Sequence, residues 1–207
     1  NGCVSADGSM AVTVTAKPTA SVAATQSICS GVAMAATTVS LNPTTAKFDW
    51  NTTTTAPTGA ATGASPTSGT AVAHLTDLAQ STLVVPNGTS SGTYTFTITP
   101  KDGACTGTAV THVVTVKAKP AKPVPTNDGP YCEGKNITLK SNVAPALAAS
   151  WNWTFGTSTA SISALQDPTP FASTSASSGY YHVSVTNTNA CVSDTGTTKV
   201  VVNTSPI

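Results

Sequence analysis

The stretch SGTYTFTI, residues 91–98, decides the fold. Its apolar residues Tyr94, Phe96 and Ile98 alternate with threonines, and this period of two predicts a half-buried β-strand. A matching stretch, SGYYHVSV, occupies residues 178–185, and each copy leads through a short turn to a cysteine. The chain therefore contains a β unit that occurs more than once.

The similarity extends on both sides of this strand. The starts of the copies match, because CSG at 29–31 parallels CEG at 132–134 and a tryptophan follows each of these cysteines by twenty-one residues. A second cysteine closes each copy and is followed fifteen residues later by a proline, a spacing typical of tandem repeats. The tryptophans are Trp50 and Trp153, and the closing pairs are Cys3 with Pro18, Cys105 with Pro120, and Cys191 with Pro206.

These spacings predict two whole repeats, 19–120 and 121–207, and make residues 1–18 the terminal strand of a preceding repeat. The strand expected at 11–18 carries Val12 and Val14 on one face. Its apolar and backbone groups need a partner. Either the chain is a window from a longer array, or this strand completes a sandwich in a neighbouring molecule.

Composition narrows the function classes. Charged residues make up only 8% of the chain against 39% hydrophobic residues, and the net charge is +1. Such a surface offers no electrostatic footprint for nucleic acid or an anionic membrane, and it puts little charge repulsion in the way of homo-oligomer or filament formation. No apolar run reaches the length of a membrane helix, so we expect no membrane span.

We find no pattern that indicates catalysis, a metal or a cofactor. The eight acidic residues are scattered, and no nucleophile elbow, zinc spacing or calcium loop is present in the sequence. The histidines do not recur at equivalent positions, and we expect His112 and His182 at surface or edge positions. Residues 51–69 have almost no apolar residue and are expected to form an exposed loop. The sequence therefore predicts a protein that is not an enzyme.

Each repeat has the marks of an immunoglobulin-like antiparallel β-sandwich. We expect Trp50 and Trp153 in the cores, accompanied by Tyr94 and Tyr181. Trp151 shares a strand face with Trp153, so it could stack on a sugar ring if that face were exposed. The inward-facing interpretation is favoured, and Trp151 stays a candidate ligand contact.

The full pattern, CxG … W … SGxY … C … VxV … P, resembles the PKD-like and gliding-adhesin repeats of giant bacterial cell-surface proteins exported by type IX secretion. Those repeats usually carry glycine before the second cysteine, whereas Ala104 and Ala190 stand there in this chain. The resemblance implies tandem sandwiches in a non-enzymatic, extracellular fibre or adhesin. Its partners would be neighbouring repeats, further copies, and a cell-surface glycan or protein. The alternative is a carbohydrate-binding module, or spacer domains of a secreted hydrolase.

Five cysteines at repeated positions predict structural disulfides in an oxidising compartment. The simplest pairing lies within each repeat. In an immunoglobulin-like topology, however, the first and second cysteines lie at opposite ends of the sandwich, about 20 Å apart at 3.3 Å per strand residue. A disulfide needs Cα atoms within about 7 Å. A bond between repeats therefore remains open. The within-repeat pairs would be Cys29 with Cys105 and Cys132 with Cys191, the bond between repeats would join Cys29 to Cys191, and Cys3 would pair outside this sequence.

Overall fold

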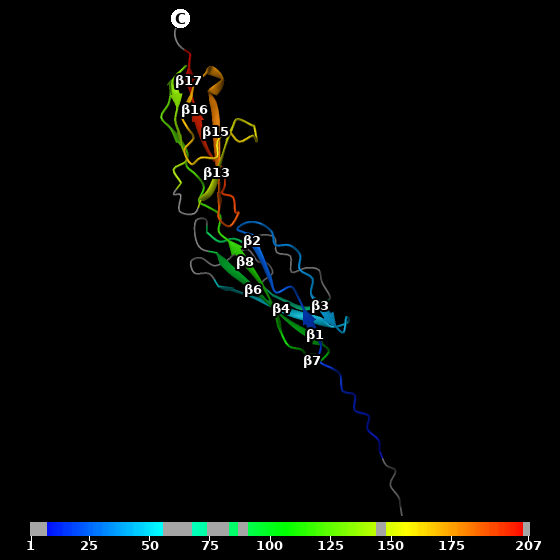
Figure 1. Ribbon diagram of the computed structural model, residues 1–207. Helices are drawn as coiled ribbons and strands as arrows, with labels where there is room; N and C mark the ends of the chain where they lie inside the picture. The colour runs from blue at the N-terminus through cyan, green and yellow to red at the C-terminus, as the bar shows by residue number, and fades with distance from the viewer. Residues whose placement is uncertain (1–7, 56–67, 74–82, 87–90, 144–147, 205–207) are drawn as a thin grey trace, which may run out of the picture.

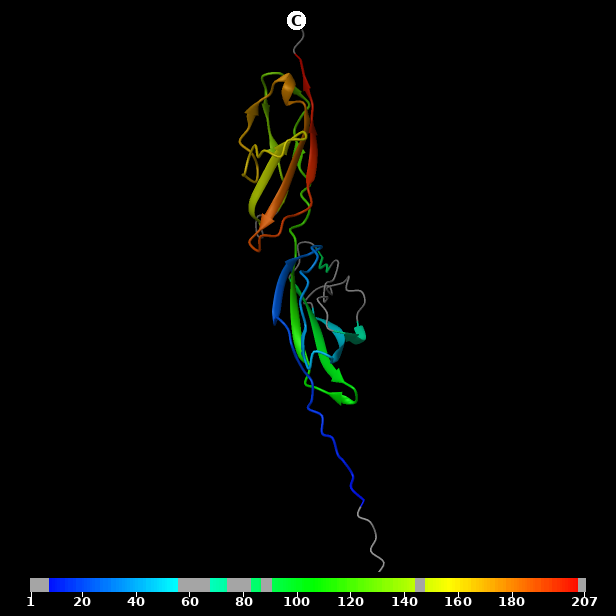
Figure 2. The ribbon, with the colours of Figure 1, turned by 90° about the vertical axis from the view of Figure 1, so that its right-hand side faces the viewer.

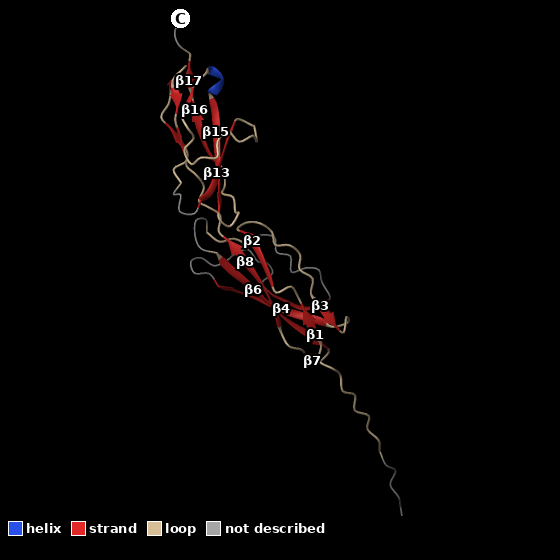
Figure 3. Cartoon of the chain, in the orientation of Figure 1, coloured by secondary structure: helices blue, strands red, loops and turns tan. Residues whose placement is uncertain are grey.

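The computed structural model describes residues 8–55, 68–73, 83–86, 91–143 and 148–204. These residues form two β-sandwiches placed end to end, with an extended segment leading into the first (Figures 1 and 2). Strands and loops account for nearly all of the described chain, and its helical content is one 3₁₀ turn (Figure 3). The prediction of an all-β, immunoglobulin-like sandwich fold is confirmed.

The first sandwich is built around the strand predicted at residues 91–98. That strand, β6, lies between β4 and β8 in a sheet ordered β2-β8-β6-β4-β5, with β7 also paired to β6 and the β1-β3 pair forming a separate small sheet. Its residues alternate strictly between buried and half-buried from Gly92 to Pro100, as the period of two requires. The strands are β1 Thr19–Ser21, β2 Thr25–Cys29, β3 Ser40–Asn42, β4 Lys47–Thr55, β5 Ser68–Ala73, β6 Gly92–Asp102, β7 Cys105–Thr106 and β8 Val110–Lys117.

The second sandwich repeats this plan with shorter strands. Its main sheet has the order β13-β15-β16, and three two-stranded ladders pair β10 with β17, β11 with β14 and β12 with β9. The elements are β9 Thr126–Asn127, β10 Tyr131–Cys132, β11 Asn136–Ile137, β12 Leu139–Lys140, β13 Ala148–Phe155, β14 Phe171–Ala172, the 3₁₀ turn η2 Ser175–Ser177, β15 Gly179–Asn187, β16 Gly196–Val200 and β17 Val202–Asn203.

Each sandwich has its own hydrophobic core. In the first, Phe48, Phe96 and Ile98 pack with valines of β8. In the second, Trp153 packs with Ile137 and with valines of β15 and β16. Burial of large apolar side chains supplies the main stabilisation of each unit.

Two expectations need correction. His112 is 1% exposed because it shares the inward face of β8 with Val114 and Val116, so the expectation of a surface or edge position is wrong. Strand β4 continues through Thr55, where the backbone pairs with β6, and β5 begins at Ser68, so the expectation of a loop is wrong for residues 51–55 and 68–69. Threonine favours strands, and here the threonine run finds a pairing partner. Residues 56–67 and His74 lie outside the described residues.

The segment before β1 is extended and unpaired. Residues 8–18 form no strand, and Val12 and Val14 are 74% and 89% exposed. The strand expected at 11–18 is therefore not formed here, because no neighbouring strand pairs with it among the described residues. The segment ends at the buried Pro18, which lies against the first sandwich.

Candidate functional site: the joint between the sandwiches

The two sandwiches are connected by a short segment rich in buried proline. It follows β8, and Pro120, Pro123 and Pro125 along it are all buried. A Cβ added to Gly196 of β16 would lie 2.3 Å from the carbonyl oxygen of Pro123, so the segment lies directly on that strand. Because proline fixes φ and this backbone is held against the sheet, the connection has few conformations available.

A disulfide crosses the joint. Cys29 at the end of β2 bonds to Cys191 in the turn after β15, with their Cα atoms 5.6 Å apart and 162 positions separating them in sequence. Cys191 is completely buried. The two sandwiches are therefore linked covalently twice, once by the main chain and once by this bond.

Asn187 builds the turn that presents Cys191. Its side-chain oxygen accepts hydrogen bonds from the N–H groups of Asn189 and Cys191, both at 3.0 Å. Ala190 takes the left-handed conformation between them, at φ 62°. The side-chain amide then donates 2.9 Å across the joint to the carbonyl of Ala118. One buried side chain thus holds both the turn and the contact between sandwiches.

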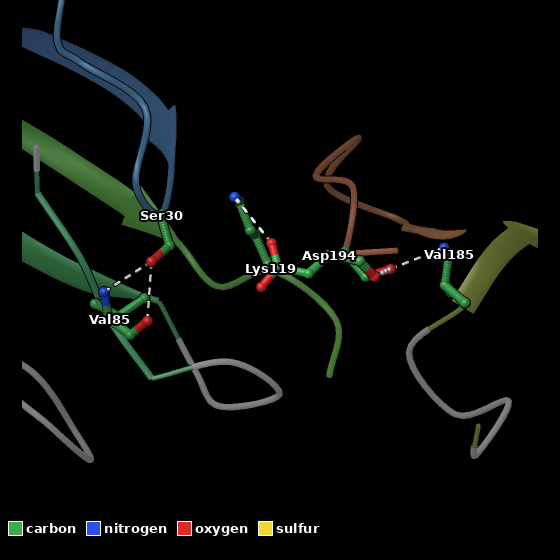
Figure 4. Close-up of polar contacts among 6 residues, drawn as sticks. Ser30, Val85, Lys119, Val185 and Asp194 are labelled. Carbon is green, nitrogen blue, oxygen red and sulfur yellow. Dashed lines mark hydrogen bonds and ion pairs between the residues drawn. The ribbon is translucent and has the colours of Figure 1, made fainter. Parts of the chain in front are cut away.

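Buried serines secure the backbone on each side of the joint (Figure 4). Ser30 accepts the N–H of Val85 at 3.0 Å and donates to its carbonyl at 2.9 Å, which ties the end of β2 to residues 83–86. Ser193 accepts the N–H of Val185 at 3.0 Å, which ties the turn after β15 back to that strand. Both serines are buried, so these bonds are shielded from water.

An ion pair adds little to the joint. The ammonium of Lys119 lies 4.0 Å from a carboxylate oxygen of Asp194, whose side chain is 63% exposed (Figure 4). Pairs of this length and exposure contribute between nothing and about 1 kcal/mol. The disulfide, the buried prolines and Asn187 carry the joint instead.

Pairing of the cysteines within repeats is wrong, because Cys29 bonds to Cys191. Cys105 in β7 and Cys132 in β10 keep free thiols. The length of the sandwich gives the reason: Cys29 lies beside Lys117 at one end of β8, whereas Cys105 follows the turn near the other end. Eight strand residues span about 25 Å, far beyond the reach of a disulfide. Cys3 lies outside the described residues.

The aromatic residues singled out from the sequence lie in the cores. Trp50, Tyr94, Trp153 and Tyr181 are each at most 8% exposed, and the indole N–H of Trp153 donates to the carbonyls of Leu165 and Gln166. Trp151 is half-buried and packs against the second core. Part of its surface is therefore covered by that core.

Part of the second sandwich is similar to a known domain family. Residues 123–202 match the family model of the PKD domain. The chain carries a PKD/Ig-like domain. Such domains are typically non-catalytic adhesion or structural modules, and a disulfide in this fold is typical of extracellular proteins.

Solved immunoglobulin-type structures resemble the chain at low identity. The N-terminal four Ig domains of Dscam1 align at 14% identity over 90% of this chain and 46% of that one, with a TM-score of 0.32. Murine CEACAM1b aligns at 12% identity over 90% of this chain and 100% of that one, with a TM-score of 0.36. A marsupial T cell receptor aligns at 12% identity over 92% of this chain and 74% of that one, with a TM-score of 0.41. The chain thus spans just under half the length of the Dscam1 structure. A comparison with curated proteins finds no match.

The PKD/Ig-like domain has a pocket away from the joint. It has a volume of about 480 Å³, and the rings of Phe155, Phe171 and Tyr181 contribute to its wall together with Ile162 and hydroxyl-bearing side chains. The same rings pack against one another, with the Phe155 and Tyr181 centroids 4.7 Å apart. Among the described residues, no charged side chain lines the pocket.

A tyrosine fixes the start of the PKD/Ig-like domain. The hydroxyl of Tyr131 donates to the carboxylate of Asp128 and accepts the N–H of Thr138 at 3.2 Å. The hydrogen bond from Tyr131 holds the pKa of Asp128 below its usual range. Burial, followed by this same bond, raises the pKa of Tyr131. The pair ties the residues before β10 to the strand that follows.

This pair predicts an acid-sensitive contribution to stability. A carboxylate whose pKa is depressed by folding stabilises the fold above its unfolded pKa of about 4, and the effect is lost as pH falls through the folded pKa. Replacing Tyr131 with phenylalanine should therefore raise the pKa of Asp128 and destabilise the second sandwich at neutral pH. NMR titration of the Asp128 carboxyl group and urea unfolding at several pH values measure both effects. A difference between the two proteins that persists unchanged below pH 3 would contradict the assignment.

The sequence did not predict the polar residues that hold the joint between the sandwiches. Asn187, Ser30 and Ser193 carry no motif, although an asparagine two positions before a turn is a recognisable signal for a side-chain-capped turn. Within the described ranges, no group of three or more His, Cys, Asp or Glu side chains could hold a metal ion. The described residues also include no helix of a length and apolarity that could cross a membrane.

Proposed function

We propose that this chain is a stiff, non-catalytic segment of a long extracellular fibre or adhesin built from tandem PKD/Ig-like repeats. In this proposal residues 19–120 and 121–207 are successive repeats and residues 1–18 close a preceding one. The bacterial cell surface and type IX secretion are its proposed setting, on the strength of the repeat pattern in the sequence.

The observation that carries the proposal is the Cys29–Cys191 bond across the joint. A freely jointed pair of domains needs no such bond, and most interfaces between domains leave relative motion open. Here a second covalent link, three buried prolines and the Asn187 contact all act on one joint. Together they restrict the angle and the twist between the long axes of the two sandwiches. A spacer or fibre segment requires such a restriction.

The exposed segment before β1 supports an array. Residues 8–15 match β8 in pattern, and Val12 and Val14 correspond to Val114 and Val116, which are completely buried in the first sandwich. An exposed extended segment with these apolar residues gains stability when it pairs with a sheet that covers them. In the proposed array, the remaining strands of the preceding repeat cover it. The charge-poor surface would allow such arrays to associate side by side.

Carbohydrate binding is the alternative function. Its site would be the pocket lined by Phe155, Phe171 and Tyr181, because Trp151 is half-buried against the second core. The polar lining of that pocket consists of serine and threonine hydroxyls. Among the described residues that line it, no side chain is an Asp, Glu, Asn, Gln or Arg that could bind two sugar hydroxyls at once. The structural role is therefore the better supported of the two.

Relative orientation of the two sandwiches tests the proposal. Residual dipolar couplings should report one common alignment tensor for both sandwiches in the oxidised chain. In the Cys29→Ser variant the two tensors should diverge, because the prolines and one hydrogen bond then act alone. Cys132→Ser is the matched control and should leave the tensors equal. Independent tensors in the oxidised wild-type chain would refute the role as a stiff segment.

A further inference from the structure

The two free cysteines occupy the same structural positions as the two bonded ones. Cys132 in the second sandwich corresponds to Cys29 in the first, and Cys105 corresponds to Cys191. We propose that Cys132 and Cys105 are complementary halves of further disulfides, each made with an adjoining repeat of the same kind. This inference rests on the proposed tandem array and names the covalent contacts that would connect it.

The surroundings of Cys132 reproduce those of Cys29 strand by strand. Cys29 pairs in parallel with Lys117 of β8, and Cys132 pairs in parallel with Asn203 of β17. The next residue donates its N–H to the same partner in each case, Ser30 to Lys117 at 2.8 Å and Glu133 to Asn203 at 3.0 Å. The cysteine thus occupies the same register at the same end of each sandwich.

The turn after each cysteine is also the same. The carbonyl of Cys29 accepts the N–H of Val32 at 3.0 Å, and that of Cys132 accepts the N–H of Lys135 at 3.1 Å. The glycine in each turn is left-handed, with φ 77° at Gly31 and 84° at Gly134. Cys132 is exposed, so its thiol is accessible to a cysteine of another repeat. The end of the second sandwich therefore carries a free cysteine at the position where the first sandwich carries a disulfide-bonded one.

Cys105 stands where Cys191 stands in the other sandwich. Each follows a tight turn with one left-handed residue, which is Gly103, two positions before Cys105, at φ 55°, and Ala190, directly before Cys191, at φ 62°. In each sandwich, the segment that leads into the sandwich also packs on a glycine that follows this cysteine in the sequence. A Cβ on Gly107 would lie 1.9 Å from the carbonyl oxygen of Pro18, as one on Gly196 would lie 2.3 Å from that of Pro123.

The two turns differ in length and in one side chain: counted from Ser91 and Ser178, the turn before Cys105 is one residue longer. Pro100 occupies the position of Asn187, and its carbonyl accepts the N–H of Gly107 at 2.9 Å. A joint made through Cys105 would therefore lack the side-chain bond that Asn187 donates to Ala118. The disulfide would carry a larger share of that joint.

The two thiols cannot pair with each other inside one chain. Strand β7, which carries Cys105, and strand β17, which pairs with the strand of Cys132, lie at opposite ends of the molecule (Figure 1). Each thiol therefore needs a partner beyond these two sandwiches. The chemistry requires two thiols and a low-molecular-weight disulfide such as oxidised glutathione. The two sulfurs bond to each other, each thiol loses a proton, and the oxidant is reduced to two thiols.

Adding a repeat to the chain tests the Cys132 half. Pro206 corresponds to Pro120, so the chain through residue 206 can be continued with a second copy of residues 121–207 in the natural spacing. After oxidation with glutathione, peptide mapping without reduction should find Cys132 bonded to Cys191 of the added copy. The Cys132→Ser version of the same protein is the control, and its added Cys191 should be free.

The Cys105 half is tested at the other end. Pro120 also corresponds to Pro18, so residues 1–120 can be followed directly by residues 19–207. Here Cys29 of the leading copy should bond to Cys105 of the following copy. Both proteins keep the original Cys29–Cys191 bond, and the spectrum of the buried Trp153 indole verifies folding.

The outcomes separate this inference from the function it rests on. Recovery of both new bonds supports it. Free thiols, glutathione adducts or scrambled pairs in either extended protein would overturn it. The proposal of a stiff segment would then still be tested by the dipolar couplings of the unextended chain. Of the disulfides discussed, that test involves only the Cys29–Cys191 bond.

Discussion

Replacing Cys191 with serine should lower the free energy of unfolding of the first sandwich by about 4 kcal/mol. The reason lies in the unfolded state. When the first sandwich unfolds and the second stays folded, Cys29 and Ala118 are both still held at the base of the second sandwich. The unfolded chain is then a closed loop of roughly 90 residues, whose entropy is reduced by about this amount. Without the disulfide the loop opens and the unfolded state gains that freedom.

Urea unfolding followed by fluorescence measures the effect. Trp50 reports on the first sandwich, and a Trp151→Phe background with Trp153 retained simplifies the signal from the second. Cys29→Ser should produce the same loss as Cys191→Ser. Cys105→Ser removes a free thiol of similar chemistry and should change the stability by less than about 0.5 kcal/mol. Equal stabilities of Cys191→Ser and Cys105→Ser would show that the bond does not restrain the unfolded chain.

The second large effect is expected at Asn187. Asn187→Ala should destabilise the second sandwich by about 3 kcal/mol, because two backbone N–H groups in the turn and one carbonyl at the joint lose their partner. Asn187 is itself buried, so water replaces these bonds poorly. Asn189→Ala, at an exposed position of the same turn, is the matched control and should be nearly neutral.

Asn187→Asp separates the two roles of this side chain. The carboxylate keeps the acceptor for the turn but cannot donate to Ala118 across the joint. We expect the second sandwich to lose less stability than with alanine, while the two alignment tensors diverge. Thermal unfolding and dipolar couplings on the same samples provide both readouts. A variant with wild-type couplings would mean that the bond to Ala118 does not orient the sandwiches.

Local pattern was enough to predict the β class and the core aromatics. The alternation in 91–98 and 178–185 depends only on neighbouring residues, and β6 and β15 follow it. The same reasoning would have placed His112 inside, since it precedes Val114 and Val116 by even steps on one strand face. Histidine's polarity outweighed its position in the prediction, whereas in the fold its ring packs near Phe96 and bonds to the carbonyl of Ala23.

The joint could not be predicted in the same way because it depends on which ends of two sandwiches meet. The repeat pattern located every cysteine but did not say which pair would be brought together. The length of a sandwich argues against pairing within it, yet only the turn built by Asn187 and the direction of the buried prolines bring Cys191 to Cys29. Such contacts join residues far apart in sequence, and no local periodicity encodes them.

The Cys29–Cys191 bond also decides which part of the chain bears tension. Pulled from residue 18 and residue 204, the covalent path runs along β2 to Cys29, crosses the sulfurs and leaves through β16 and β17. Nearly all residues of both cores lie between Cys29 and Cys191 in the sequence, so the disulfide bypasses them and they bear no tension. Only about 25 residues can be drawn out, or roughly 85 Å, where an unbridged chain of this size would yield about 650 Å. A pulling force on these two residues would therefore lengthen the bridged chain far less than an unbridged one.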